Sequence, residues 1–479
     1  MHDALRLLSS LTDGDAAWIF DVASERPVSA GSVVVAEGAN PHALWLVLSG
    51  QVAVTVGAAP ERTIARLGPG ELIGEMALLE GTAASATVTA VEDTRLLELA
   101  HSALLQHSAL DPGFAARLYR ALALVLSQRL RRTTRLEAAT TTDDLGAGAD
   151  AWRALETQLT AFKTLMVNAD KLASKHGDVV PDDVQAQITD GMATFATLLA
   201  EHIGDRSSLD PHTRAVLGQR VQRELLPFLL LSEVADRMYR KPRGYAGDFM
   251  TIEIMYRNQP GGTGRLGPAL DRAFRTRPAN RAVMNRRGLL AEEIANAMTE
   301  RQGERTHVTS LASGPAAELF DVFGTLQDPT TLKATCVDID LQALAFVGER
   351  VEQRGLRRQF DLHNENLVYL AMGRRKLDLQ PQDLIYSIGL IDYFADKFVV
   401  MLLDWIHDRL RPGGRVILGN FHPDNVDKAL MDHVFEWQLI HRSEADMNAL
   451  MRASKFGRDC TSIRFEDERV NLFAGCVKG

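Results

Sequence analysis

Several small or acidic residues that follow apolar runs have the side-chain types needed to bind a nucleoside. The segment VTSLASGPAAELF has the pattern of a strand, a small-residue turn and a helix. A turn made of Ala312, Ser313 and Gly314 lets the backbone approach a ligand closely, and the following helix N-terminus favours polar or anionic groups. Asp338 ends the next apolar run, where its carboxylate can accept hydrogen bonds from both ribose hydroxyls. Asp340, two residues later, is expected to cap the next helix.

The elements that must position these residues form an alternating pattern. After Arg305, apolar runs alternate with helical segments: HVTSLA, LKATCVDID, RRQFDLHN, QDLIYSIG and GGRVILGNF. This order predicts a parallel, doubly wound sheet. The last two runs, CTSIRFEDE and VNLFAGCVKG, lie close together and predict a closing hairpin. We therefore expect a seven-stranded, Rossmann-like α/β domain over residues 301–479.

The order of these segments resembles class I S-adenosylmethionine-dependent methyltransferases. SLASGPAAEL stands where that family has LGCGPG, with Ala312 and Ala316 in place of glycines, and RPGGRVILGNF is frequent in the family. The resemblance implies S-adenosyl-L-methionine as cofactor. It places Asn364 or Asn366 against the adenine, and Gly389 at the cleft where methionine and acceptor meet. A nicotinamide dehydrogenase would need a stronger glycine fingerprint and lacks the closing hairpin.

Residues 151–300 show helical spacing and almost no β-branched runs, which predicts a helical substrate or cap domain. The segment KPRGYAGD interrupts the helices with Pro and Gly. The stretch from Tyr239 to Tyr256, together with GNF and EWQLIHR, resembles a bacterial family that makes 3-hydroxypalmitic acid methyl ester. This resemblance implies a small-molecule acceptor, such as the carboxylate of a hydroxy fatty acid, which accepts the methyl group on oxygen.

A carboxylate acceptor needs positioning more than a base, because it is already ionised at neutral pH. Arg442 or Arg243 could hold it. For a hydroxyl or amine acceptor, His422 would be the first candidate general base. The candidate acceptor-site residues are Arg243, Tyr245, Tyr393, His422, Trp437 and Arg442. The sequence does not choose between these acceptors.

The first 139 residues predict a different domain. Short β-branched runs between Pro27 and Ala100 indicate a β-roll, and Pro112 opens a long amphipathic helix. The Leu and Val stripe of this helix suggests a homodimer. TTTDDLGAGAD, residues 140–150, loses periodicity and is expected to be a linker.

The segment GELIGEMALLEGTAASATVTA resembles the phosphate-binding cassette of cyclic-nucleotide-binding domains. The resemblance implies that Gly74 and Glu75 contact the cyclic phosphate and ribose, beside Ser85 and Thr87. The cassette arginine falls at Ala84. Losing that charge-assisted bond costs about 1.5 to 3 kcal/mol, so the domain is either a weakened sensor of cyclic AMP or cyclic GMP or a scaffold.

The amino-acid composition argues against several classes of function. The 479 residues carry 53 Lys and Arg against 62 Asp and Glu, a formal charge of -9 that disfavours nucleic acid as a partner. The three cysteines suggest neither disulfides nor a metal site. No signal peptide or membrane span is expected, which favours the cytoplasm. The alternative to an enzyme is a non-catalytic sensor or assembly protein with a degenerate methyltransferase fold.

Overall fold

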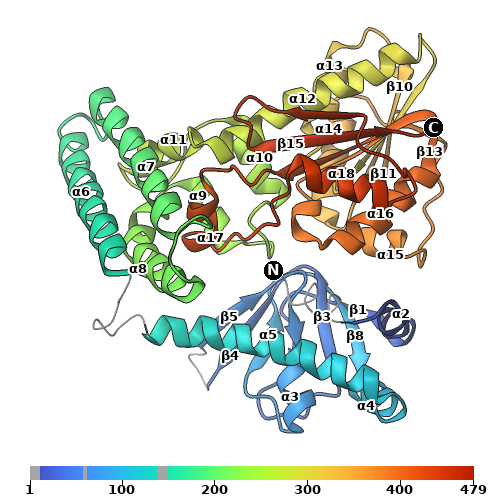
Figure 1. Cartoon of the computed structure of the whole chain (residues 1–479), viewed down its shortest axis with the longest axis horizontal. Helices are drawn as coiled ribbons and strands as arrows, with labels where there is room; N and C mark the ends of the chain where they lie inside the picture. Colours follow the sequence, from blue (N-terminus) through green and yellow to red (C-terminus); the bar gives the residue numbers. More distant parts are fainter. Residues whose placement is uncertain (1–10, 58–61, 139–147) are drawn as a thin grey trace. The chain divides into compact units, whose positions relative to one another are not determined.

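The computed structural model describes residues 11–57, 62–138 and 148–479, which fall into two compact units (Figure 1). Unit 1 comprises residues 1–140 and 241–246, and unit 2 comprises residues 141–240 and 247–479. The helical segment and the C-terminal sheet, which the sequence suggested as separate domains, thus share one unit. The expected linker lies mostly outside the described residues, but its last two residues, Ala149 and Asp150, already belong to a helix.

Unit 1 is a β-roll of two four-stranded sheets, as predicted. Their strand orders are β1-β8-β3-β6 and β2-β7-β4-β5, with antiparallel pairings throughout. The strands are β1 Ser24–Val28, β2 Val33–Val35, β3 Ala43–Ser49, β4 Val52–Val56, β5 Arg62–Leu67, β6 Leu72–Ile73, β7 Thr87–Ala90 and β8 Thr94–Ala100. The helices are α2 Asp13–Val22, α3 Glu75–Glu80, α4 His101–Leu110 and α5 Pro112–Ala138.

The long helix α5 begins at Pro112, as predicted from its periodicity. Its residues Leu118, Leu122 and Val125 are buried in a core cluster of unit 1 together with Phe114. This part of the apolar stripe is therefore covered by its own domain. Pairing of α5 with a second chain stays a prediction.

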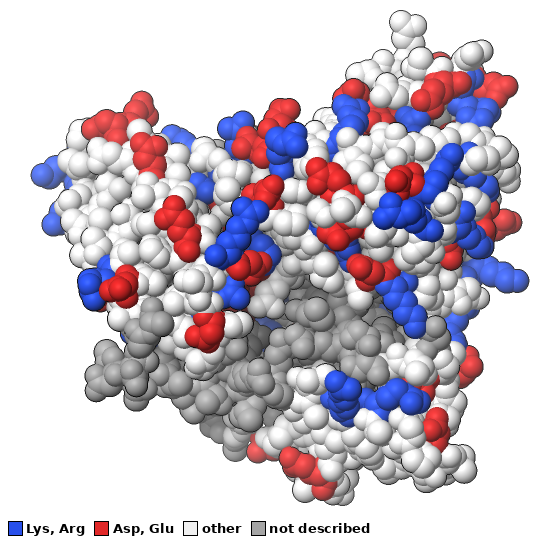
Figure 2. Space-filling view, viewed as in Figure 1, with Lys and Arg blue, Asp and Glu red and all other residues white. Residues whose placement is uncertain are grey.

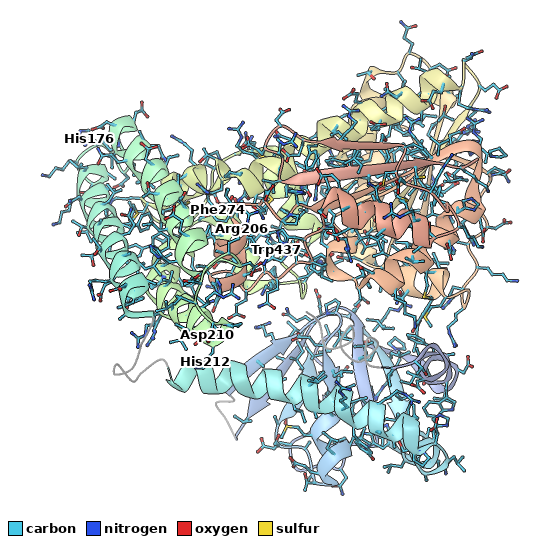
Figure 3. All side chains as sticks on the ribbon, viewed as in Figure 1. His176, Arg206, Asp210, His212, Phe274 and Trp437 are labelled. Carbon is cyan, nitrogen blue, oxygen red and sulfur yellow. The ribbon has the colours of Figure 1, made fainter. Side chains whose placement is uncertain are left out.

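Unit 2 begins with seven helices. They are α6 Ala149–Ala173, α7 Asp182–Ile203, α8 Pro211–Leu229, α9 Glu233–Arg240, α10 Phe249–Arg257, α11 Gly267–Arg275 and α12 Pro278–Glu300. Asp210, which Figure 3 labels beside His212, caps α8, and its carboxylate accepts hydrogen bonds from the amides of His212 and Thr213. The KPRGYAGD segment separates α9 from α10, as its Pro and Gly content predicts.

The sheet of unit 2 has seven strands in the order β11-β10-β9-β12-β13-β15-β14. Strands β9 to β13 pair in parallel, and β14 and β15 add antiparallel pairings at one edge. The strands are β9 Thr306–Leu311, β10 Leu332–Asp338, β11 Phe360–Asn364, β12 Gln382–Ile388, β13 Leu410–Phe421, β14 Ser462–Phe465 and β15 Asn471–Val477. Five of them lie within the predicted runs, while β9 begins one residue and β13 three residues before the predicted run.

Helices pack on both faces of this sheet. One buried cluster joins α12, α13 and α14 to one face, and a second joins α16 and α18 to the other. The helices and short turns of this part are α13 Ala317–Thr325, η2 Pro329–Thr331, α14 Leu341–Gln353, α15 Leu367–Ala371, η3 Ile391–Tyr393, α16 Asp396–Arg409, α17 Lys428–His433 and α18 Glu444–Ala453. The strand order reverses between β9 and β12, where sheets of this kind form a ligand crevice at the carboxyl ends of the strands.

The face in Figure 2 shows acidic and basic side chains interspersed over the residues that are drawn in colour. Such a surface has no single-sign patch for a polyanion to follow. Across the described ranges, no helix is long and apolar enough to cross a membrane, and no group of three potential metal ligands occurs.

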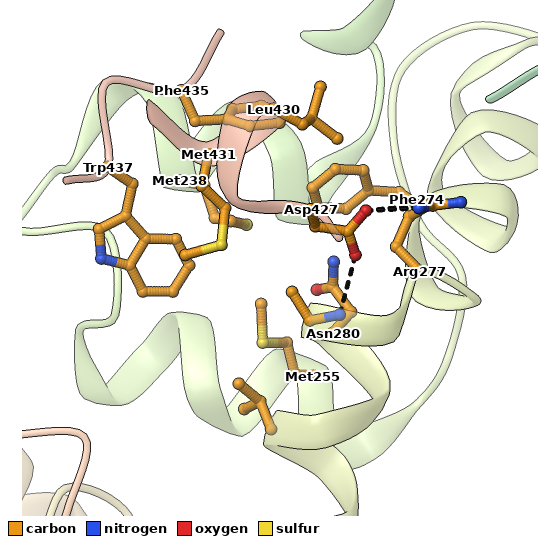
Figure 4. A pocket seen from close by; sticks show the side chains of 12 residues that line it. Met238, Met255, Phe274, Arg277, Asn280, Asp427, Leu430, Met431, Phe435 and Trp437 are labelled. Atoms are coloured by element: carbon orange, nitrogen blue, oxygen red, sulfur yellow. Dashed lines mark hydrogen bonds and ion pairs between the residues drawn. The ribbon is translucent and has the colours of Figure 1, made fainter. Parts of the chain in front are cut away.

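A buried ion pair ties α12 to the segment that precedes α17 (Figure 4). Asp427 is 1% exposed and accepts hydrogen bonds from Nε of Arg277 at 2.9 Å and from the amide of Ala279 at 2.9 Å. The guanidinium and carboxylate have both lost water, so each depends on the other for compensation.

We predict that Asp427→Ala lowers the free energy of unfolding by about 3 to 5 kcal/mol, because it leaves the Arg277 guanidinium buried and unpaired. Urea unfolding of the full chain, followed by circular dichroism, measures the change. Arg206→Ala is the matched control, since its pair with Asp424 is exposed and is worth about 1 kcal/mol or less. Equal costs for the two variants would contradict the assignment.

Candidate functional site at the carboxyl edge of the sheet

The turn between β9 and α13 has an open backbone shape that alanine usually avoids. Ala312, Gly314 and Ala316 all have positive φ, of 53°, 52° and 47°. The two alanines hold the left-handed conformation at a cost of about 1 to 2 kcal/mol each. Ser313 is buried, and its hydroxyl has no oxygen or nitrogen hydrogen-bond partner among the described residues, although it interacts weakly with the buried thiol of Cys336. The turn therefore keeps its shape without the expected glycines and leaves one buried polar atom unsatisfied.

Asp338 links this turn to the end of β10. Its two carboxylate oxygens accept hydrogen bonds from the amides of Gly314 and Asp340, each at 2.9 Å. Burial raises the pKa of Asp338 to about 6, although these amide bonds oppose the shift. Each oxygen retains a lone pair for a further donor. The structure thus brings together the turn and the acid that the sequence predicted as one site.

The other polar residues at this edge make local bonds. Asp340 caps α14, as predicted, and accepts from the amides of Gln342 and Ala343. The Asn364 side chain donates to the carbonyls of Asp338 and Ile339, at 3.1 and 2.8 Å. Asn366 caps α15. Asn364 thus holds the chain at the end of β10, whereas Asn366 only begins α15, and the expected contact of either with adenine stays a prediction.

Gly389 follows β12 with a φ of +77° and lies against a residue that the sequence analysis missed. A Cβ at Gly389 would lie 3.0 Å from Nη1 of Arg286, which is 7% exposed on α12. Nε of Arg286 donates to the hydroxyl of Tyr256 at 3.4 Å. The available signal was an arginine at a position where the helical period of α12 predicts a core residue.

Two buried acids lie near this arginine. Tyr386 donates to Glu318 at 2.6 Å, and burial raises the pKa of Glu318. Asp392 accepts from the amide of Phe421 with one oxygen, while its other oxygen has no partner in the described part of the chain. Burial raises the pKa of Asp392 to about 6, and the positive charge of Arg286 lowers the pKa of both acids.

Two of the predicted acceptor-site residues contact each other. The indole nitrogen of Trp437 donates to the hydroxyl of Tyr393 at 2.8 Å, and burial raises the pKa of Tyr393 well above its usual value. A Cβ at Gly247 would lie 3.4 Å from that hydroxyl and from the Trp437 ring. A neutral phenol and an indole therefore line this position, beside a glycine of the loop before α10.

Arg442 does not have the role that we expected. It is 2% exposed, and all three of its nitrogens donate within unit 2. The acceptors are the carboxylate of Asp396, the side chain of Asn420, and the carbonyls of Ile391 and Phe394. These five hydrogen bonds use every N–H of the guanidinium. Arg442 holds the segment after β12 in place and has no donor left for a substrate carboxylate.

His422 is also occupied. Its Nε2 lies 3.1 Å from the carboxylate of Glu444, and its Nδ1 accepts from the amide of Asp424 at 3.2 Å. In this arrangement neither nitrogen can take a proton from an acceptor, so the general-base expectation is not supported. Arg243 and Tyr245 lie in residues 241–246, which belong to unit 1. Their roles toward the acceptor stay predictions.

An apolar cavity lies beside Trp437 (Figure 4). Its volume is about 10 Å³, room for roughly one water molecule. The side chains that enclose it include Met238, Met255, Met431, Phe274 and Phe435. Methionine side chains repack readily, so such a wall can adapt to an apolar group.

In unit 1, the predicted cassette residues lie around helix α3. Gly74 has a φ of +89° and precedes this helix, and a Cβ there would lie 2.6 Å from the carbonyl oxygen of Ala43. Glu75 is buried in the first turn of α3. Thr87 accepts a hydrogen bond from the amide of Glu37, and Ser85 is exposed. Only glycine fits at position 74 without strain.

Two family models match parts of the chain. The model described as "Cyclic nucleotide-binding domain" matches residues 25–109, and the model described as "Putative methyltransferase" matches residues 244–466. Among curated proteins, the cyclic AMP receptor protein of Thermus thermophilus is 49% identical over 71 residues, 14% of this chain and 33% of that protein. Glutaminase 2 of Bradyrhizobium diazoefficiens is 36% identical over 124 residues, 26% of this chain and 19% of that protein.

Among solved structures, a Bordetella parapertussis protein described as a possible exported protein is 22% identical, with a TM-score of 0.43. That match covers 61% of this chain and 96% of the other. The matched segments span a third or less of the length of the curated relatives. The N-terminal side of the chain therefore matches the cyclic nucleotide-binding domain model, and the C-terminal side matches the methyltransferase model.

Proposed function

We propose that unit 2 is an S-adenosylmethionine-dependent methyltransferase that acts on a small molecule. The observation that carries this proposal is the bond between Asp338 and Gly314 beside the unsatisfied hydroxyl of Ser313. These groups lie at the carboxyl ends of β9 and β10, next to the reversal of strand order. The family-model match over residues 244–466 supports the same activity.

The residues at this edge fit an adenosyl cofactor. Asp338 can accept from both ribose hydroxyls, and Ser313 offers a buried hydroxyl that needs a partner. Gly389 leaves room at the end of β12 for the amino-acid part. When bound, S-adenosylmethionine supplies an activated methyl group on a sulfonium centre. The chain's part is to orient the acceptor oxygen in line and to exclude water.

We propose a carboxylate as the acceptor, as the resemblance to the 3-hydroxypalmitic acid methyl ester family implies. The engaged nitrogens of His422 support this choice, since a carboxylate needs no general base. The cavity beside Trp437 has room for roughly one water molecule, so an acyl chain would enter there only as the surrounding methionines repack. Tyr393 and Trp437 would then separate the acyl chain from the reacting centre.

We expect the purified full-length chain, incubated with methyl-labelled S-adenosylmethionine and a bacterial lipid extract, to release a labelled lipid methyl ester. Mass spectrometry identifies the product. Binding of the cofactor without any labelled product would favour a non-catalytic sensor. Thermal stabilisation by NAD but not by S-adenosylhomocysteine would favour a dehydrogenase instead.

The raised pKa of Asp338 predicts a pH dependence of cofactor binding. The ionised carboxylate accepts hydrogen bonds from the ribose hydroxyls. The affinity for the cofactor is therefore highest well above pH 6 and falls as the pH drops through that value. We expect S-adenosylhomocysteine to bind about tenfold more weakly at pH 5 than at pH 8 in calorimetry. Asp338→Asn should bind weakly at both values, with little pH dependence. The same slope in both proteins would contradict the assignment.

We also propose that unit 1 senses a cyclic nucleotide weakly and regulates the methyltransferase. Ala84 is half-buried in the cassette, where an arginine would pair with the phosphate. Ala84→Arg should therefore tighten binding of cyclic AMP or cyclic GMP about ten- to a hundredfold in calorimetry. Ala83→Arg, at the exposed neighbouring position, is the matched control. Equal affinities for wild type and both variants would favour a scaffold.

A further inference from the structure

Arg286 is a buried cation without an anionic partner. Within residues 148–479, four arginines are buried: Arg275, Arg277, Arg286 and Arg442. The other three form ion pairs with Asp271, Asp427 and Asp396. In the described part of the chain, Arg286 forms no ion pair, and its guanidinium makes one long hydrogen bond, from Nε to the hydroxyl of Tyr256.

The nearby acids bond to other groups. One oxygen of Asp392 accepts from the amide of Phe421, and Glu318 accepts from the hydroxyl of Tyr386. Burial raises the pKa of both acids, and the charge of Arg286 opposes that shift from a distance. Neither forms an ion pair with Arg286. Both terminal nitrogens of the guanidinium therefore remain available to a ligand.

Arg286 lies at the carboxyl edge of the sheet, where sheets of this kind form a ligand crevice. Nη1 would lie 3.0 Å from a Cβ at Gly389, at the end of the strand beside the reversal of strand order. Burial raises the pKa of Tyr256, on α10, and of Tyr393, in the turn after β12, and the charge of Arg286 opposes both shifts. The side chain thus lies among residues from α10, α13 and η3, at the carboxyl edge of the sheet.

A guanidinium stays charged when buried, and leaving it unpaired costs several kcal/mol. Its planar donors match the two oxygens of a carboxylate. We propose that Arg286 binds a carboxylate group in the cleft of unit 2. Resting on the proposed function, this carboxylate has two sources: the amino-acid part of S-adenosylmethionine, or the methyl acceptor.

Calorimetry on the full chain with Arg286→Met distinguishes these sources. If the carboxylate is the cofactor's, S-adenosylhomocysteine should bind about ten- to a hundredfold more weakly, while 5′-methylthioadenosine, which lacks the carboxylate, binds as to wild type. If it is the acceptor's, S-adenosylhomocysteine should bind normally and octanoate should lose affinity. Binding of neutral 1-octanol should not change.

Arg287→Met is the matched control, because Arg287 is adjacent, partly exposed and paired with Asp321. It should change none of these affinities. Arg286→Lys keeps the charge without the planar donors, should fold if Arg286→Met does not, and should show a smaller loss for the same ligand. Unchanged affinity for both S-adenosylhomocysteine and octanoate, or an equal loss for 5′-methylthioadenosine, would overturn the proposal.

A wild-type chain that binds neither adenosyl compound would contradict the proposed function instead. In that case, loss of octanoate binding in the Arg286→Met variant would still support a carboxylate site. Octanoate binding that is absent from wild type, or unchanged in the variant, would then overturn the inference as well.

Discussion

The carboxylate of Asp338 determines the arrangement of the candidate site. It accepts one amide from the turn after β9 and one from the turn after β10, so two separate strand ends are fixed to one side chain. Burial raises its pKa and the amide hydrogen bonds lower it, and the result is a pKa of about 6. Because both turns depend on this carboxylate, the position of Ser313 depends on it too.

The buried arginines of unit 2 differ in whether an acid inside the protein pairs with them. Those that are paired have a structural role, and the one that forms no ion pair is the candidate binding residue. Arg442 donates five hydrogen bonds to four acceptors and holds the segment after β12. Arg277 is neutralised by Asp427. Each is costly to bury, and each is compensated inside the protein. Arg286 has the same cost and forms no ion pair within the described residues, which is the basis for the carboxylate site proposed there.

Local sequence patterns predicted the fold well, because the periodicity of strands and helices depends on residues that are close together in the sequence. The turn kept its left-handed shape at Ala312 and Ala316 since the surrounding strand and helix fix the backbone even without glycine. The roles of Arg442 and His422 could not be predicted from local sequence patterns. Their partners Asp396 and Glu444 come from other elements, and only the folded chain brings them together. Arg286 was missed because it lies inside a regular helix.

The site also extends beyond the sheet into the helical segment. The Cβ of Phe249 on α10 lies 3.9 Å from the position of a Cβ at Gly314, and Tyr256 on the same helix contacts Arg286. Glu253, between them, pairs with Arg350 of α14. Helix α10 thus lies beside both the turn after β9 and Arg286. The family-model match, which begins at residue 244, includes this helix. A domain boundary placed where the helices end and β9 begins would separate α10 from the turn and the arginine that it contacts.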